Sequence, residues 1–270
     1  MDETTRPADS REAAQSGRRA WLDSIRFLFL LALAAWVLRS LIVAPFSIPT
    51  GSMMPTMLPG DYLFVSKWPY GYSRFSFPGQ IPAFEGRIFE RLPERGDVVI
   101  FKRPSAEAAD WVKRVIGLPG DRIALNGGVL FINGKRVTRE SRGELELPAS
   151  RNIQCGIDET STCRYPAFVE TLPNGRSYVT FDQTPFAPRD NFGPVTVPPG
   201  HLFLLGDNRD DSSDSRFTLA EGGIGMVPLD RVIGRAAFSF WSTDGSASYW
   251  KPWTWFSALR SNRIGQGFQP

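Results

Sequence analysis

Residues 95–125 read RGDVVIFKRPSAEAADWVKRVIGLPGDRIAL and carry the clearest strand pattern of the chain. Two runs within them, 97–101 and 111–118, are rich in Val, Ile, Phe and Trp, which fit a pleated, half-buried surface. The tetrapeptide LPGD at 118–121 is typical of a tight turn. The stretch therefore predicts two strands followed by a turn, and a mainly β protein.

The composition of the whole chain agrees with this fold class. Its 270 residues are 42% hydrophobic, enough for one sizeable core or two modest ones. The 25 glycines and 22 prolines favour turns and strands over long helices. A net charge of only +3 gives no reason to expect nucleic-acid binding. One histidine and two cysteines are too few for an ordinary structural zinc site, and we expect no metal and no other cofactor.

Lys113 has an unusual position in the second predicted strand. Side chains alternate between the faces of a strand, so Lys113 shares a face with Trp111 and Val115, whereas Arg114 lies on the other. A lysine at an exposed strand edge is the ordinary interpretation. A lysine held among apolar groups is favoured in its neutral form, and its amine can then act as a general base.

A second segment, 46–61, reads FSIPTGSMMPTMLPGD and places one serine, Ser52, between glycine and methionine. Its three internal prolines exclude a helix, so we expect an extended segment with tight turns. Ser52 alone would be interpreted as a turn serine.

An apolar run of about 20 residues, 25–44, precedes this segment and is long enough for one membrane-spanning helix. Arg39 lies near its end, where an arginine can reach the head groups. A cleaved signal peptide is the competing interpretation, but Pro45 is a poor cleavage position, and a retained anchor fits better. Arginines at 18, 19 and 26 precede the run, which predicts a cytoplasmic N-terminus and an extracytoplasmic remainder.

A third segment, 201–217, reads HLFLLGDNRDDSSDSRF, an apolar strand that runs into an acidic loop. A calcium loop is one alternative, because acidic or hydroxyl residues occur at Asp210, Ser212, Asp214 and Glu221 with EF-hand spacing. The glycine that such a loop requires is replaced by Ser215, so a solvated loop fits better. The only histidine, His201, begins the strand, and we interpret it as structural rather than catalytic.

Cys155 and Cys163 are the two cysteines, and they enclose a short polar segment. A disulfide is plausible for an extracytoplasmic domain, and two free thiols remain the alternative.

Taken together, four stretches resemble the conserved boxes of bacterial type I signal peptidases, and they follow an N-terminal anchor in the order of that family. The stretches are SIPTGSMMPTMLPGD, RGDVVIFKRP, VKRVIGLPGD and GDNRDDSSDSR. The resemblance covers most of 46–121 and 197–235, and is loose over 122–196. It implies a membrane-anchored serine endopeptidase with a Ser/Lys dyad that removes signal peptides from exported preproteins.

The resemblance also implies individual roles. Ser52 would be the nucleophile and Lys113 the general base, with the oxyanion bound by the Ser52 N–H and the Thr50 hydroxyl. Ser212 would orient the lysine amine, and Asp214 and Arg216 would form a buried salt bridge that supports the loop. Gly206 and Asp207 would serve the turn before it.

Shallow apolar pockets for small side chains are implied as well, which means A-x-A cleavage sites in an extended substrate. The pocket for the residue before the cut would be lined by Ile48, Pro49, Met53, Met57, Trp111 and Val112. The pocket two residues further upstream would be lined by Phe46, Leu63 and Ile100. An ordinary hydrophobic core is the alternative for all of these positions, and for Leu63 and Ile100 it fits equally well.

We expect the following organisation: a disordered cytoplasmic tail, the anchor, a β catalytic core in two pieces that contains an extended ribbon, an inserted β-rich subdomain without a catalytic role, and an aromatic and basic tail. The ranges are 1–24 for the first tail, 25–44 for the anchor, 45–121 and 197–245 for the core, 68–96 for the ribbon, 122–196 for the insert and 246–270 for the last tail. The last tail suits either core packing or contact with lipid head groups.

The expected partners are signal-peptide-bearing preproteins and the phospholipid bilayer, with no nucleic acid. The expected location is the bacterial inner membrane, as a single-pass protein with its catalytic domain on the periplasmic side. A monomer is expected, although the sequence defines neither the oligomeric state nor the preproteins that are cut. Two alternatives remain, namely another Ser/Lys processing peptidase and a membrane-tethered β module that binds peptides without catalysis.

Overall fold

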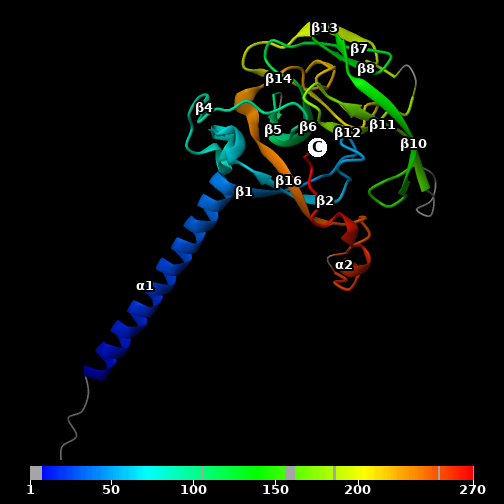
Figure 1. Ribbon diagram of the computed structural model, residues 1–270. Helices are drawn as coiled ribbons and strands as arrows, with labels where there is room; N and C mark the ends of the chain where they lie inside the picture. Colours follow the sequence, from blue (N-terminus) through cyan, green and yellow to red (C-terminus); the bar gives the residue numbers. More distant parts are fainter. Residues whose placement is uncertain (1–7, 105, 156–161, 185–186, 249, 270) are drawn as a thin grey trace, which may run out of the picture.

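The computed structural model describes residues 8–104, 106–155, 162–184, 187–248 and 250–269. One long helix projects from a body built mainly of strands (Figure 1). The helix α1 runs from Ala8–Val37 and continues into the π-helical turn η1, Leu38–Ile42. Within it, Trp21–Ile42 has a mean hydropathy of 2.0 and is long and apolar enough to cross a membrane. The predicted fold class, a β-rich body after one such helix, is confirmed.

The bounds of this helix differ from the prediction at both ends. A disordered tail was expected over 1–24, but the helix begins at Ala8; residues 1–7 lie outside the described part. Residues 8–20 contain Ala, Glu, Gln and Arg, which are good helix formers and can extend a helix that the apolar run nucleates. At the other end, Ala44 was expected in the helix but pairs with Val65 in a sheet.

A seven-stranded antiparallel sheet forms the centre of the body, with the order β1-β2-β16-β5-β6-β14-β15. Its strands are β1 (Val43–Ser47), β2 (Asp61–Ser66), β5 (Val98–Arg103), β6 (Ala106–Gly117), β14 (His201–Leu205), β15 (Val227–Pro228) and β16 (Val232–Ser242). Side chains of β5 alternate between two apolar clusters, with Val98 and Ile100 in one and Val99 and Phe101 in the other. The sheet is therefore packed on both faces, which explains the nearly continuous apolar run of this strand.

Two smaller sheets are formed by strands that all lie between residues 122 and 196. One contains β10 (Thr138–Pro148), β11 (Thr162–Thr171) and β12 (Ser177–Phe181), and the other contains β7 (Arg122–Asn126), β8 (Val129–Ile132), β9 (Lys135–Arg136) and β13 (Phe192–Thr196). The hairpin between β8 and β9 turns at Asn133 and Gly134, both with positive φ, as the Asn-Gly pair predicts. Cys155 and Cys163 are joined in a disulfide; the residues between them, 156–161, lie outside the described part.

The ribbon expected over 68–96 is shorter than predicted. It contains the 3-10 turns η2 (Trp68–Tyr70), η3 (Arg74–Ser76) and η4 (Pro78–Gln80), and the two-residue strands β3 (Tyr72–Ser73) and β4 (Arg87–Ile88). Four prolines in this range interrupt strand pairing, because each lacks the backbone N–H that a ladder needs.

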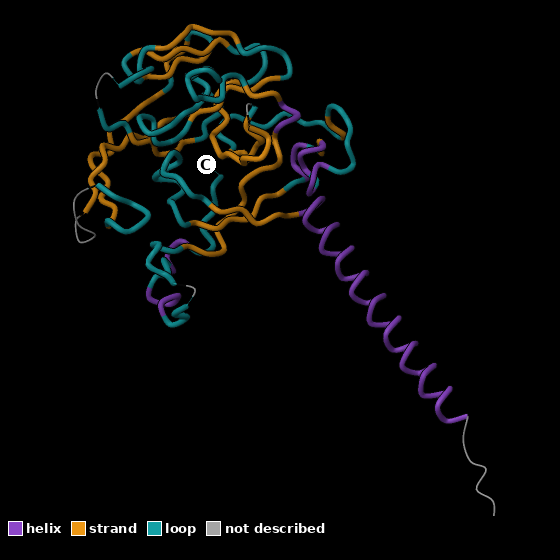
Figure 2. The backbone as a smooth tube through the Cα atoms, turned by 180° about the vertical axis from the view of Figure 1, so that it is seen from behind, coloured by secondary structure: helices purple, strands orange, loops and turns teal. Residues whose placement is uncertain are grey.

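The turn η5 (Leu229–Arg231) precedes β16. After β16 the chain forms a short tail, which contains the helix α2 (Thr254–Ser257) and the turn η6 (Ser261–Arg263). Trp250 is 92% exposed, and Trp253 and Phe256 are also exposed, so these rings do not pack in the core. The tail lies on the same lower side of the body as the long helix (Figures 1 and 2).

Candidate active site

Ser52 and Lys113 lie far apart in the sequence but meet in the structure. Ser52 is in the proline-bounded turn after β1, and Lys113 is in β6, opposite Val99 of β5. Lys113 Nζ donates a hydrogen bond to Ser52 Oγ at 2.7 Å. This is the distance that proton transfer between the two groups requires.

The environment of Lys113 favours the neutral amine. Lys113 is only 2% exposed, and burial lowers its pKa from 10.5 to about 8, although Asp214, Asp207 and Asp211 oppose the shift. The Nζ atom also lies 5.4 Å from the centre of the Trp111 ring, the neighbour that the strand pattern placed on the same face. A substantial fraction of Lys113 is therefore unprotonated at mildly alkaline pH.

The loop after β14 holds the backbone of Ser52 in place. Asn208 N–H donates to Ser52 O, and Asn208 Nδ2 donates to Gly51 O, each at 3.2 Å. Gly206 is required here, because a Cβ atom at this position would lie 2.5 Å from Ser52 O and 2.2 Å from Ser212 Oγ. Sequence reasoning left Asn208 without a role.

Thr50 lines the cleft beside Ser52, as an oxyanion donor would have to. Among the described residues, Ser52 N–H donates to no backbone carbonyl, so this donor is available to a ligand. Both groups lie on the turn that carries the Ser52 hydroxyl.

The buried salt bridge predicted for the loop is present, whereas the predicted contact of Ser212 is not. Arg216 donates from Nε and Nη2 to the two carboxylate oxygens of Asp214, each at 2.9 Å, and both residues are buried. Burial alone would raise the pKa of Asp214, but Arg216 and the Gly206 N–H outweigh it and lower this pKa. Ser212 Oγ lines the cleft but is buried without a hydrogen-bond partner, so the predicted hydrogen bond to Lys113 is not formed and the amine donates to Ser52 instead.

A second buried ion pair involves Arg114, the neighbour of Lys113 on β6, and sequence reasoning missed it. Arg114 donates from Nε and Nη2 to Asp207 at 2.7 and 2.6 Å, and Thr56 Oγ1 donates to the same carboxylate. The pair joins β6, the turn after Ser52 and the loop after β14. Its only sequence signal was a charged residue on the face of β6 opposite Lys113.

Asp207→Asn should lower the free energy of unfolding by about 3–5 kcal/mol, because Arg114 would stay buried without an opposite charge. Chemical unfolding of the full chain in detergent, followed by circular dichroism, measures the change. Glu146→Gln is the matched control, since it removes one partner of the exposed Arg164–Glu146 pair and should change stability by less than about 1 kcal/mol. Equal stability of the two variants would contradict the assigned role of the pair.

The insert also contacts the loop after β14. Glu170 on β11 accepts a charged hydrogen bond from Arg209, and both side chains are buried. Arg209 O in turn accepts from Arg216 Nη2. The region 122–196, for which no catalytic role was expected, therefore supports the segment that holds Ser52.

Ser52 and Lys113 both line a cleft of about 400 Å³. Six of the predicted substrate-binding residues line it, namely Phe46, Ile48, Pro49, Ile100, Trp111 and Val112. Met53, Met57 and Leu63 are not among the lining residues of this cleft; their side chains are fully buried in the same apolar cluster as Ile48 and Ile100. The side chains of an irregular turn follow no fixed period, so the sequence does not tell which of them face the cleft and which face the core. Residues that line the cleft could therefore not be distinguished from residues that support it.

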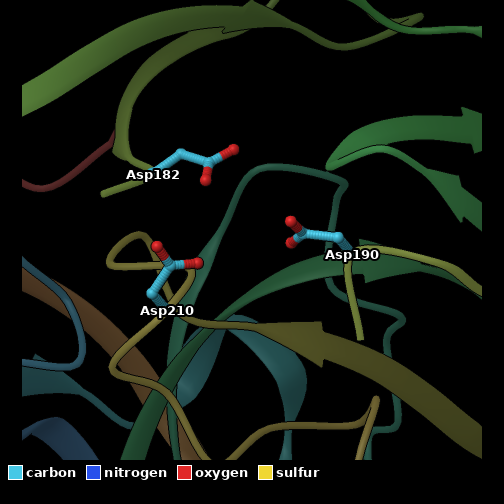
Figure 3. Close-up of side chains that lie close together, drawn as sticks. All are labelled: Asp182, Asp190 and Asp210. Carbon is cyan, nitrogen blue, oxygen red and sulfur yellow. The ribbon is translucent and has the colours of Figure 1, made fainter. Parts of the chain in front are cut away.

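Three carboxylates, Asp182, Asp190 and Asp210, have oxygens within 4.8 Å of one another and point toward a common centre (Figure 3). Protein donors engage two of the three, since Arg139 pairs with Asp182, and the N–H groups of 183 and 184 donate to Asp210 Oδ2, whereas Asp210 Oδ1 is buried without a hydrogen-bond partner. We assign no metal to this cluster.

The EF-hand set considered from the sequence is not assembled around one centre. Asp214 pairs with Arg216, whereas Glu221 accepts from Thr218 and Arg189. His201 Nδ1 lies 2.9 Å from Pro199 O, and the residue does not line the cleft.

Comparison with known proteins agrees with this geometry. The family described as Signal peptidase, peptidase S26, matches residues 21–241. The Signal peptidase I of Rickettsia typhi is 38% identical over 276 residues, covering 94% of this chain and 96% of the relative. That of Rickettsia massiliae is 40% identical over 259 residues, covering 88% and 89%.

A crystal structure of a signal peptidase I from Enterococcus faecalis V583 is 26% identical and covers 54% of this chain and 97% of its own, but its TM-score of 0.30 adds no weight. The family match, by contrast, spans most of the chain, and the two relatives are aligned over nearly their whole length. This chain therefore belongs to the signal peptidase family, peptidase S26.

Proposed function

We propose that this chain is a membrane-anchored serine endopeptidase that removes signal peptides from exported preproteins with a Ser52/Lys113 dyad. The observation that carries the proposal is the 2.7 Å hydrogen bond between the two side chains at the floor of the cleft. Its relatives are named Signal peptidase I, and the chain has one helix long and apolar enough to serve as an anchor.

The proposed reaction is acyl transfer in two steps. Neutral Lys113 takes the proton of the Ser52 hydroxyl while the oxygen attacks the carbonyl carbon of the scissile bond. The C–N bond then breaks, Lys113 gives its proton to the leaving amine, and the signal peptide remains as an ester on Ser52. A water molecule, deprotonated by the same amine, hydrolyses the ester and regenerates both groups.

The Ser52 N–H and the Thr50 hydroxyl are the proposed donors to the oxyanion. The free Ser52 N–H and the location of Thr50 in the cleft support these roles. Removing one such donor typically costs roughly 10²–10³ in rate. Ser212 Oγ, buried and unpaired in the cleft wall, is a proposed acceptor for the ammonium that forms on Lys113.

The cleft suits an extended peptide. Among the described strands, β1 pairs only with β2, and β6 pairs with β14 only from Arg114 onward, so each has a free edge beside the cleft. An extended substrate can add hydrogen bonds to such edges, as in β-augmentation. The apolar walls at Ile48, Trp111 and Val112 then favour small side chains, which gives the proposed A-x-A preference.

A preprotein with an A-x-A site tests this function. We expect the purified chain in detergent to cut directly after the second alanine, as determined by mass spectrometry of the products. Replacing that alanine by leucine should lower kcat/KM by roughly 10- to 100-fold, because the extra methylenes overfill the pocket. Equal cleavage of both substrates, or cleavage elsewhere, would contradict the proposed specificity.

We propose that the N-terminus is cytoplasmic and that the body lies on the outer face of the bacterial inner membrane, against the bilayer. The C-terminal segment around α2 lies on the same lower side of the body as α1 (Figures 1 and 2), and the exposed rings of Trp250, Trp253 and Phe256 in this segment suit the head-group region. The nucleophile would then lie close to the membrane surface, where an anchored signal peptide arrives.

The pH dependence of the reaction follows from the lowered pKa of Lys113. Only the neutral amine can act as base, so kcat/KM should fall about tenfold per unit as the pH decreases below about 8 and level off above it. Asp211→Asn removes a carboxylate that raises the pKa of Lys113, so the whole limb should move to lower pH. Initial rates from pH 5.5 to 10 measure both profiles, and a limb near the ordinary lysine pKa would contradict the assignment.

A further inference from the structure

A second cavity lies beside the substrate cleft, at the end of the apolar helix. Its volume is about 460 Å³, and it shares Phe46 and Asp110 with the cleft. Its charged lining residues are Arg39, Lys67, Lys102 and Asp110, and its apolar wall consists of Ala44, Phe46, Phe75, Phe77, Pro78 and Ile233. We name it the cationic cavity.

The charges of the cationic cavity do not balance. Lys102 pairs with Asp110 at 2.7 Å, which uses the one carboxylate among the charged lining residues. Lys67 is 5% exposed, and its Nζ donates to Ser76 O at 2.7 Å, which occupies one of three N–H donors. Burial lowers the pKa of Lys67 to about 8, and Arg39 and Lys102 add to this effect against Asp110. Lys67 and Arg39 thus form an excess of positive charge that an anion would relieve.

The position of the cationic cavity indicates where that anion comes from. Arg39 belongs to η1, the last turn of the stretch Trp21–Ile42 that can cross a membrane. The ring of Trp36 stacks on that of Phe77, with centroids 6.2 Å apart, so the end of the helix packs against one wall of the cavity. The end of a membrane-spanning helix lies at the level of the lipid head groups. This step rests on the membrane anchoring proposed above.

We propose that the cationic cavity binds the phosphate of an anionic phospholipid, with Arg39, Lys67 and Lys102 as its donors. The apolar wall would contact the glycerol and the first methylenes of the acyl chains, which inorganic phosphate does not have. Phe46 lines both the cationic cavity and the substrate cleft, so the two lie side by side. A lipid bound in the cationic cavity would therefore also fix the distance between the cleft and the bilayer.

Calorimetric titration of the full chain in neutral detergent tests this site, with dihexanoyl-phosphatidylglycerol, dihexanoyl-phosphatidylcholine and inorganic phosphate as probes. Phosphatidylglycerol should bind about tenfold more tightly than either of the others. Lys67→Met and Lys102→Met should each weaken its binding about tenfold, since each removes a charged hydrogen-bond donor. Lys251→Met, which removes an exposed lysine of the C-terminal tail, is the matched control and should bind like wild type.

Equal binding of the two lipids would overturn the proposal, as would an equal loss in Lys251→Met, which would indicate only general surface charge. If inorganic phosphate bound as tightly as phosphatidylglycerol, the cavity would recognise phosphate alone, and the proposed lipid site would be ruled out. Thermal unfolding checks that each variant is folded, and Lys102→Met, at a partly exposed position, decides the matter if Lys67→Met does not fold. Cleavage of the A-x-A preprotein in detergent is measured separately, so failure of the proposed function is distinguishable from failure of the lipid site.

Discussion

Ser52→Ala should lower kcat/KM for an A-x-A preprotein by at least about 10⁴-fold, the largest effect of any single substitution that we expect. The reason is the loss of the proposed nucleophile, the hydroxyl to which Lys113 Nζ donates in the cleft. The change removes one oxygen atom from a turn that prolines and Asn208 hold in place, so the melting temperature should change little. Single-turnover cleavage followed by gel electrophoresis measures the loss.

Ser177→Ala is the matched control for this variant. Ser177 is an exposed serine on β12 that pairs with Thr171 and does not line the cleft, so its loss should leave the rate unchanged. Wild-type activity of Ser52→Ala would show that another group attacks the substrate and would remove the dyad from the proposed mechanism.

Lys113→Met should lower kcat/KM roughly 10²–10⁴-fold, the range that general base catalysis supplies. Methionine fills a similar volume without a proton acceptor, so the buried site should stay packed. The same variant should lose the pH dependence near pH 8 in whatever activity remains, because the titrating amine is gone.

Lys113→Arg separates the role of a base from that of a positive charge. An arginine stays protonated and cannot accept the serine proton, so this variant should be as inactive as Lys113→Met. Lys135→Met, at an exposed position on β9, is the control for the removal of a lysine. Substantial activity of Lys113→Arg would mean that position 113 acts through its charge alone, which contradicts the proposed mechanism.

Much of the fold was predictable from local pattern. The strands over 98–103 and 106–117 follow from β-branched runs bounded by turns, and the hairpin at 133–134 follows from its Asn-Gly pair. The helix bounds were less predictable. Polar helix formers extend the helix at its N-terminal end to Ala8. At its other end the helix stops before Ala44, because Ala44 pairs with Val65 in the sheet.

The site was predictable where a short segment specifies it and unpredictable where distant segments meet. Ser52 and Lys113 were identified by motif resemblance, and the structure places them within hydrogen-bonding distance. The predicted hydrogen bond of Ser212 is absent, because it depends on side-chain directions in a loop with no regular period.

The sequence by itself determined a mainly β body after one apolar helix, and a serine and a lysine on segments that suit their chemistry, because alternation, turn residues and apolar length are local properties. Only the tertiary structure decided which charges are paired. Arg114 with Asp207, Glu170 with Arg209, and the unbalanced cations beside Lys67 are each brought together by sheets that join residues far apart in the chain. Burial then sets their energetics, since a charge that is harmless in water must find a partner once strands enclose it.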